Sequence, residues 1–295
     1  MKKAVSLVAV LCIGVAIFFV NESNLNLDSI FNSSSDKAEN IQTSEADKAL
    51  ADITYNKNKA PENYVKLNEN KTKLNKDDKD LLNQKGSNKA WQNYEHLDKL
   101  GRAEKVTGLV TNKIVTQRSA KYMKDNGILY HNEKIYKRPS FPSYVHVSGE
   151  YNHGWFDKYK QRWKGEKSNN AKTNLGTYKG WLYNKSHTLG WSLGGDMETH
   201  NVTLGTRSQN VGSGQDGGMG YPESKVRDAV RQNKRAKIYY QADPVYKNSE
   251  LVPRGTHVRA YSVNDNGKTL NMNLWVFNRQ DGVKINYRTG TWNEV

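Results

Sequence analysis

The chain has 295 residues, of which 36% are hydrophobic and 25% are charged, and its formal net charge at pH 7 is +15. Its 7 Trp, 17 Tyr and 6 Phe supply enough bulky side chains for a core, which excludes disorder over the whole chain. A mean hydropathy of −0.88 excludes a multi-span membrane protein, and the single cysteine excludes a disulfide-stapled scaffold.

The N-terminus has the layout of an export signal. Lys2 and Lys3 precede an uninterrupted apolar run over residues 4–20, and a polar stretch follows. Residues 1–22 are therefore expected to be either a cleaved signal peptide or an uncleaved membrane anchor. Either form places the rest of the chain outside the cytoplasm, so we expect a secreted or cell-surface bacterial protein.

A polar segment follows the export signal. Residues 23–80 are rich in Asn, Ser, Asp and Lys, and they are expected to form a linker or N-terminal extension. Aromatic residues that could pack begin at Trp91 and Tyr94. We therefore expect one folded domain over residues 81–295.

The positive charge lies mainly in the later part of the chain. Residues 1–60 carry 6 basic and 7 acidic side chains, whereas residues 61–295 carry 39 basic and 23 acidic ones, a net charge of +16. A basic body suits a polyanionic partner such as nucleic acid, an anionic cell-wall polymer or an anionic membrane. Charge alone leaves these three partners open.

Basic and aromatic residues interleave over residues 155–185. Such a mixture could hold a phosphate backbone and stack bases. The same residues are equally compatible with core aromatics and solvated lysines. If the segment contacts phosphates without reading base edges, binding would show little sequence preference.

One helix is expected near Pro222, because proline is tolerated in a first helical turn and Glu223 suits its positive end. Val226, Ala229 and Val230 would form its apolar stripe.

Alternating and β-branched residues then predict strands over residues 236–242, 257–263 and 269–277. Asn- and Gly-containing turns at 264–267 and 280–282 make this part an antiparallel meander. In the third strand Leu270, Met272, Leu274 and Val276 share one face. The predicted fold class is α+β, with a central antiparallel sheet and few helices.

Residues 181–231 hold the side chains that phosphodiester cleavage needs. A neutral imidazole can take a proton from water, a hard divalent cation needs only one or two protein oxygens, and a guanidinium can hold phosphate oxygens. Taken singly, each residue has an ordinary structural interpretation, so only the set and its spacing indicate a site. The candidates are His187, Asn201, Arg207, Asn210, Glu223 and Arg227.

The order of these residues resembles a known family. Asn184-Lys185-Ser186-His187 is similar to the Asp-Arg-Gly-His motif of the DNA/RNA non-specific endonucleases, the ββα-metal or His-Me finger class. It is closer still to the Asn-Arg-Ser-His form of exported, streptodornase-like deoxyribonucleases of Gram-positive bacteria. The blocks 201–212 and 217–223, with Arg227, resemble the same branch. The likeness extends to about residue 290 and adds a ββα-metal finger to the expected fold.

The resemblance implies a role for each matched residue. His187 would be the general base and Asn210 the direct metal ligand. Glu223 would orient metal-bound waters, Asn201 would brace the finger, and Arg227 would reach the phosphate.

Two further residues are implied as substrate contacts, Arg207 and Lys185. Lys185 stands where the family has arginine, which removes a bidentate fork. Asn184 stands where the family usually has an acidic residue, so this chain lacks any function of that carboxylate.

The implied activity is metal-dependent, sequence-non-specific endonuclease hydrolysis of DNA to 5′-phosphate ends, with RNA as a further candidate substrate. Mg²⁺ is the expected cation, which Mn²⁺ or Ca²⁺ could replace or assist. No small-molecule cofactor is expected, the protein is expected to be a monomer, and it would meet a membrane only through its N-terminal segment.

Other functions also fit parts of the sequence. A non-catalytic nucleic-acid or cell-wall binding protein would share the basic charge and the aromatic residues. A DNA-uptake nuclease would differ only in being anchored to the membrane. A polymorphic toxin nuclease would need a large delivery domain.

The glycine pattern at 212–217 does not follow a predicted strand, which argues against a dinucleotide site. His146 and His153 suggest a zinc site only weakly, because they lack the usual ligand spacing.

Overall fold

The computed structural model describes residues 40–41, 47–128, 130–131, 135–136, 140–176, 179–212 and 216–295. The chain divides into two units, Met1–Lys37 and Ala38–Val295. The first unit, with the predicted export segment, lies outside the described residues. Within the described ranges, every helix is too short or too polar to traverse a lipid bilayer.

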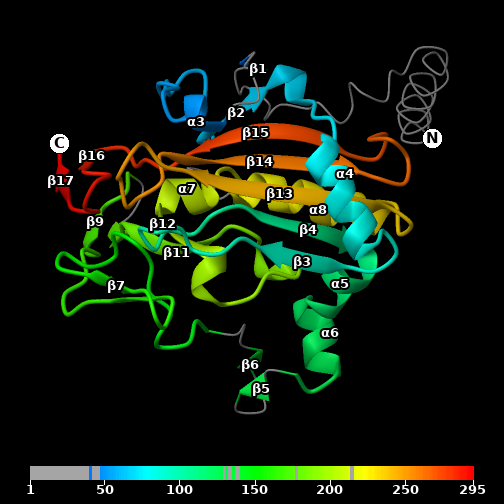
Figure 1. The fold of residues 1–295 in the computed structure, drawn as a ribbon, viewed down its shortest axis with the longest axis horizontal. Helices are drawn as coiled ribbons and strands as arrows, with labels where there is room; N and C mark the ends of the chain where they lie inside the picture. The colour runs from blue at the N-terminus through cyan, green and yellow to red at the C-terminus, as the bar shows by residue number, and fades with distance from the viewer. Residues whose placement is uncertain are drawn as a thin grey trace, which may run out of the picture. The chain divides into compact units, whose positions relative to one another are not determined.

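A seven-stranded sheet with the order β1-β2-β15-β14-β13-β4-β3 forms the centre of the second unit (Figure 1). Its neighbours pair antiparallel except β1 and β2, which are parallel. The meander predicted near the C-terminus is confirmed as three adjacent strands. The strands are β1 (Asn40–Ile41), β2 (Tyr64–Leu67), β3 (Trp91–Tyr94), β4 (Val106–Thr111), β13 (Lys237–Val245), β14 (Gly255–Ser262) and β15 (Asn271–Phe277).

Side-chain alternation gives the sheet two buried faces. On β15, Met272, Leu274 and Val276 face one core cluster, as the sequence predicts, whereas Trp275 and Phe277 face a second cluster. Because β15 is buried on both faces, other elements must pack on each face of the sheet.

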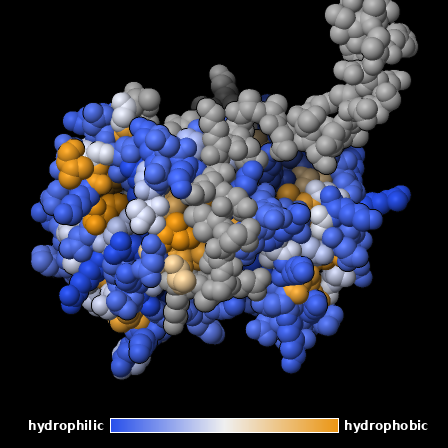
Figure 2. Space-filling model, turned by 90° about the horizontal axis from the view of Figure 1, so that it is seen from above, coloured by the Kyte–Doolittle hydropathy of each residue, from blue (hydrophilic) through white to orange (hydrophobic). Residues whose placement is uncertain are grey.

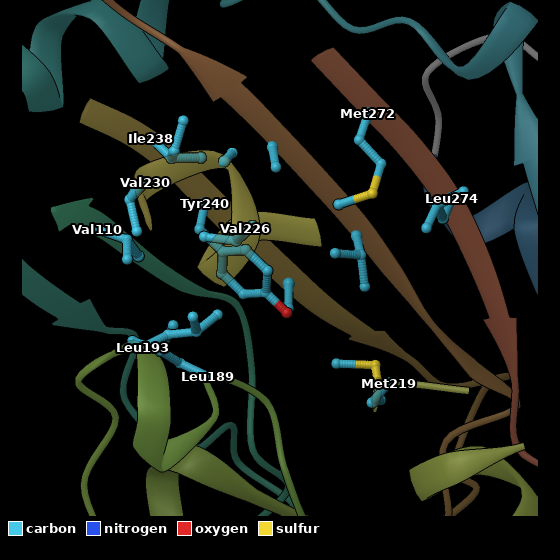
Figure 3. Packing of buried hydrophobic residues seen from close by; sticks show 14 of the residues in the cluster. Val110, Leu189, Leu193, Met219, Val226, Val230, Ile238, Tyr240, Met272 and Leu274 are labelled. Atoms are coloured by element: carbon cyan, nitrogen blue, oxygen red, sulfur yellow. The ribbon is translucent and has the colours of Figure 1, made fainter. Parts of the chain in front are cut away.

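Helix α8 (Gly220–Gln232) covers one face of the sheet. Val226, Ala229 and Val230 are buried against β4, β13 and β14, so the predicted apolar stripe is confirmed. Figure 3 shows Val226 and Val230 close to Tyr240 and Ile238 of β13. Burying a valine side chain contributes about 1.5–3 kcal/mol, so this stripe is a main attachment of the helix.

Helix α4 (Lys76–Lys85) packs on the opposite face. It begins with a capping box between Asn75 and Asp78, which satisfies two backbone N–H groups. Leu82 packs with Leu109 and Tyr239 of the sheet.

The prediction of a linker or N-terminal extension over residues 23–80 is wrong for the C-terminal part of that range. Residues 64–67 form β2, which pairs with β15, and Tyr64, Val65 and Leu67 are buried. Three apolar residues are sufficient here, because an open sheet edge supplies the hydrogen bonds and the core supplies the contacts. The folded part therefore begins before residue 81.

A smaller layer lies beside the sheet and contains the hairpin of β11 (Tyr183–His187) and β12 (Val202–Thr206). The turn at 280–282 does not extend the meander, since β16 pairs with β17 in a separate hairpin.

The face drawn in Figure 2 is mostly hydrophilic, with small separate hydrophobic areas. The remaining elements are α3 (Asp47–Leu50), η1 (Asn68–Asn70), α5 (Asn112–Gln117), α6 (Ala120–Asp125), β5 (Tyr130–His131), β6 (Ile135–Tyr136), β7 (Trp155–Asp157), β8 (Arg162–Lys164), β9 (Lys172–Asn174), β10 (Lys179–Trp181), η2 (Trp191–Leu193), η3 (Thr199–Asn201), α7 (Arg207–Val211), β16 (Val283–Ile285) and β17 (Trp292–Glu294).

Candidate active site

His187 is the last residue of β11, opposite Val202 of β12. Its imidazole stacks on Phe141 with ring centroids 4.9 Å apart, and Nε2 lies 3.3 Å from Met197 Sδ. These contacts hold the half-buried ring on two sides. The strand end thus presents an oriented imidazole at the edge of the hairpin.

The loop that joins β11 to β12 is held by Asn201, whose side chain is fully buried. Asn201 Oδ1 accepts from the Leu189 N–H at 2.9 Å, and Nδ2 donates at 3.0 Å to the carbonyl oxygens of Leu189 and Asp196. The Thr188 N–H donates to the Asn201 carbonyl oxygen at 2.9 Å. One amide therefore ties both ends of this loop directly after His187.

Asn210 lies on α7, which follows β12 directly. Thr206 caps the helix by accepting from the Gln209 N–H at 3.0 Å. Gly205 lets the helix lie close to β11, because a Cβ there would fall 2.6 Å from Ser186 Cβ. Ser186 Oγ donates to Asn210 Oδ1 at 3.3 Å, which links the metal-ligand candidate to the residue beside His187.

Glu223 and Arg227 lie one turn apart on α8. Glu223 lies against Gly190, since a Cβ at Gly190 would be 2.4 Å from Glu223 Oε1. Arg227 donates to Ser192 Oγ at 2.9 Å and to Ser224 Oγ at 2.7 Å, and its Nη1 lies 3.7 Å from Glu223 Oε2. The arginine is thus directed toward the loop that follows His187.

These elements enclose one cavity of about 560 Å³. It brings together four of the predicted residues, His187, Asn210, Glu223 and Arg227. Three arginines and one carboxylate line it, so the cavity is suited to an anionic ligand. Its other lining residues are Val115, Arg118, Ser119, Ala120, Phe141, Gly190, Trp191, Ser192, Met197, Val211, Gly220, Ser224 and Arg231.

Two predicted substrate residues do not line this cavity. Lys185 Nζ donates to the Val145 carbonyl oxygen and lies 3.5 Å from Glu150 Oε1. Arg207 opens α7, where its N–H donates to the Leu182 carbonyl oxygen at 2.9 Å. Their phosphate contacts stay predictions.

The donor set of the cavity fits a hard divalent cation. Asn210 and Glu223 both offer oxygen atoms, and Mg²⁺ binds through one or two protein oxygens while it keeps several waters. Within the residues that the structure describes, no group of three or more His, Cys, Asp and Glu side chains could hold a metal. A structural zinc site, in which Cys and His side chains supply all the ligands, would need such a group.

Tyr240 lies under the site from the sheet. Its hydroxyl donates to the Thr188 carbonyl oxygen at 3.4 Å, and burial, together with the charge of Glu223, raises the pKa of the Tyr240 phenol well above its usual value. This tyrosine therefore stays neutral and supports the loop after His187.

The basic and aromatic segment at 155–185 divides between surface and core. Trp155, Tyr159 and Trp181 are exposed, whereas Trp163 and Tyr183 are buried. Trp163 and Tyr183 thus belong to the core, and nucleic-acid binding by the exposed aromatic residues stays a prediction.

Several residues of the cavity were not among the sequence candidates. Arg231 lies one turn after Arg227, so the same i,i+4 spacing could have identified it. Arg118 lies over the ring of Trp191 at 3.4 Å, and Phe141 comes from another distant segment. No local pattern connects these two residues to His187.

Comparison with known proteins identifies relatives of this chain. The family model for the DNA/RNA non-specific endonucleases matches residues 158–264. A deoxyribonuclease of Streptococcus dysgalactiae subsp. equisimilis is 38% identical over 128 residues, which are 42% of this chain. The match spans 38% of that relative's length.

Solved structures extend the likeness over most of the chain. The Sda1 nuclease with a bound zinc ion has a TM-score of 0.62 and 26% identity, covering 82% of this chain and 100% of that one. NucA from Streptococcus agalactiae with a magnesium ion bound has a TM-score of 0.52 and 22% identity, covering 79% of this chain and 88% of that one. These likenesses confirm the expected α+β fold.

Proposed function

We propose that the protein is an exported, metal-dependent endonuclease that hydrolyses DNA without sequence preference, since the model of the DNA/RNA non-specific endonuclease family matches residues 158–264. The observation that carries the proposal is the single cavity shared by His187, Asn210, Glu223 and Arg227. The similarity to a deoxyribonuclease and to the Sda1 nuclease supports it.

His187 is the proposed general base. Phe141 and Met197 hold its ring, and Asn201 fixes the backbone that follows it. A neutral imidazole accepts a proton from an attacking water molecule, and such proton transfer contributes about 10²–10⁴-fold to a rate. Asn201 acts through this positioning and touches no substrate.

Asn210 and Glu223 are the residues proposed to hold a divalent cation. Asn210 would supply a direct ligand, and Glu223 would hydrogen-bond the waters around the ion. A cation bound there would neutralise negative charge as the phosphodiester bond breaks. Mg²⁺ is the proposed ion, with Mn²⁺ and Ca²⁺ as substitutes.

Arg227 is the proposed phosphate contact. Its hydrogen bonds to Ser192 and Ser224 preset the guanidinium before substrate arrives, and preset donors lose less entropy on binding. Arg118 and Arg231 add positive charge to the same cavity. Arg207 and Lys185 are further proposed substrate residues, each outside this cavity.

DNA is the proposed substrate, and RNA is a second substrate to be compared with it. The protein is proposed to act as a monomer, in a secreted or cell-surface form, and to leave 5′-phosphate ends. The N-terminal apolar segment supports export.

Cleavage of plasmid DNA by the purified protein tests this proposal. We expect Mg²⁺-dependent cleavage that a chelator abolishes, and we expect His187→Ala to reduce its rate by about 10²–10⁴-fold. The matched control is His153→Ala, because His153 is exposed and outside the cavity.

Two results would contradict the proposal. The His187→Ala variant could fold and cut DNA at the rate of the unchanged protein. Alternatively, the unchanged protein could bind DNA but cleave neither DNA nor RNA with Mg²⁺, Mn²⁺ or Ca²⁺, as expected for a non-catalytic binding protein.

A further inference from the structure

A second cavity lies where β4 ends and α5 begins. Its volume is about 710 Å³. Residues from the loop before β3, from α5 and from the segment between α8 and β13 line it. We call this cavity the basic groove, and its lining residues are Asn88, Lys89, Ala90, Thr111, Asn112, Lys113, Ile114, Gln117, Lys234, Arg235, Ala236, Lys237 and Asn264.

The groove carries five positive charges and no carboxylate. The cations are Lys89, Lys113, Lys234, Arg235 and Lys237. In the part of the chain that the structure describes, none of the five is paired with an acidic side chain. Lys237 Nζ donates to Asn88 Oδ1 at 3.0 Å, which leaves its charge uncompensated. Like charges gathered without counter-charges favour an anionic ligand.

The groove adjoins the active-site cavity, with α5 between them. Lys113, Ile114 and Gln117 of this short helix face the groove, whereas Val115 lines the active-site cavity, as does Arg118 directly after the helix. Helix α8 packs against α5 and makes the same connection. Its Arg227 and Arg231 line the active-site cavity, and Lys234 and Arg235 line the groove soon after the helix ends.

Basic residues of α8 and of the segment directly after it run from the active-site cavity to the groove. Arg227 and Arg231 lie four residues apart on α8, a rise of about 6 Å, and Lys234 and Arg235 follow the helix, which ends at Gln232. One strand of a duplex carries a phosphate about every 3.4 Å along its axis. The two arginines on α8 therefore span roughly two phosphates, and Lys234 and Arg235 extend the series into the groove.

We propose that the basic groove binds the phosphates of the nucleic-acid strand that flanks the bond being cut. This inference rests on the proposed nuclease function and adds a site outside the catalytic cavity. The cations are spread along an open groove and do not converge on one buried point, so an extended polyanion fits better than a small anion. Because no base-reading geometry is needed, the contacts would not depend on sequence.

The test uses the triple variant K113A/K234A/R235A of the full chain. We expect kcat/KM on long duplex DNA to fall about tenfold or more at 0.15 M salt. We expect kcat/KM on bis(p-nitrophenyl) phosphate, which is too small to reach the groove, to be unchanged. In chelator, the slope of log association constant against log salt for a duplex should become shallower by about 2.7, since each lost phosphate contact removes about 0.9.

Two matched variants separate this effect from net charge and from damage to the fold. K57A/K284A/R288A removes three exposed cations, and Figure 1 shows β16 and β17, which carry or adjoin Lys284 and Arg288, at the opposite end of the sheet from α5. We expect that variant to keep the slope of the unchanged protein. The conservative variant K113R/K234R/R235K should also keep it.

The outcomes distinguish this inference from the proposed function. The groove proposal would be overturned if the triple variant and the unchanged protein had equal salt slopes of DNA binding and equal kcat/KM on DNA. An equal loss on DNA and on the small diester would overturn it as well, as would loss of binding to phosphatidylglycerol vesicles with DNA binding intact. If the unchanged protein cleaves neither substrate, the nuclease proposal fails, while the salt slopes still test the groove.

Discussion

Gly190 lies where the carboxylate of Glu223 meets the loop after His187. Its backbone has φ −60° and ψ 146°, a conformation open to any residue. The absence of a side chain is what matters, because a Cβ would fall 2.4 Å from Glu223 Oε1. Because glycine has no side chain, it leaves the space that the Glu223 carboxylate occupies. This is the carboxylate proposed to orient the metal-bound waters.

Gly190→Ala should therefore impair the site without unfolding the protein. The added methyl group would push aside the flexible end of Glu223, and we expect DNA cleavage to fall about 10- to 100-fold, as for other residues that orient metal ligands. The melting temperature of the Gly190→Ala variant should change little. The double variant G190A/E223A should be no slower than E223A, because both changes act through one carboxylate. Independent, additive losses would contradict this explanation.

Asp196 provides a pH-dependent contact in the loop between β11 and β12. Burial tends to raise its pKa, but the hydrogen bond and charge of His200, whose Nε2 lies 2.7 Å from Asp196 Oδ2, outweigh burial and hold the pKa below its usual value. A lowered folded-state pKa stabilises the fold above the unfolded-state pKa of about 3.9, and this contribution is lost as pH falls through the folded value.

Asp196→Asn should accordingly lower the melting temperature at pH 5–7, and the difference from the unchanged protein should shrink below about pH 4. Thermal melting between pH 3 and pH 7 measures this directly. A difference that stays constant down to pH 3 would show that the charge of Asp196 is not responsible.

At the scale of elements, α4 is joined to the sheet by a buried ion pair. Arg259 of β14 donates to both carboxylate oxygens of Asp78 at 3.0 Å, and the Tyr239 hydroxyl donates to Asp78 Oδ1 at 2.8 Å. Asp78 also belongs to the capping box of α4. One carboxylate therefore serves the helix start and the contact with the sheet.

Asp78→Ala should destabilise the fold by about 3–5 kcal/mol, because it leaves the Arg259 charge buried without its partner. Denaturant unfolding gives this value. Asp80→Ala is the control, since Asp80 is exposed on the same helix and should cost less than about 0.5 kcal/mol. Equal effects for the two variants would exclude the ion pair as the cause.

At the scale of the whole molecule, the segment before β3 supports the active site from a distance. The Gly218 N–H donates to the Glu62 carbonyl oxygen at 2.9 Å, directly before α8. Tyr64 of β2 stacks on Tyr221 of α8 with ring centroids 4.3 Å apart. Residues that sequence composition assigns to a linker thus contact the helix that carries Glu223 and Arg227.

A chain that begins at Leu81 should therefore fold poorly and lose DNA cleavage, whereas a chain that begins at Ala38 should keep both. The shorter chain lacks β2, the first part of α4 and the contacts of Glu62 and Tyr64 with α8. Circular dichroism, melting and plasmid cleavage of the two chains compare these expectations. Equal stability and activity would place the domain start at residue 81 after all.

The sequence by itself determined the α+β class, the C-terminal meander, the apolar stripe of α8 and a compact set of site candidates. It could do so because a hairpin and two following helices bring together residues that are near in sequence, from His187 to Arg227. Periodicity and local motifs report such short-range order directly.

Only the tertiary structure decided the rest. Arg118 and Phe141 reach the site from distant segments, Glu62 accepts a hydrogen bond from Gly218 before α8, and Lys185 contacts Glu150 instead of lining the cavity. Residues 64–67 form a strand because β15 offers an edge to pair with, not because their own composition demands it. Long-range contacts depend on which surfaces the folded chain brings together, and no local pattern records that information.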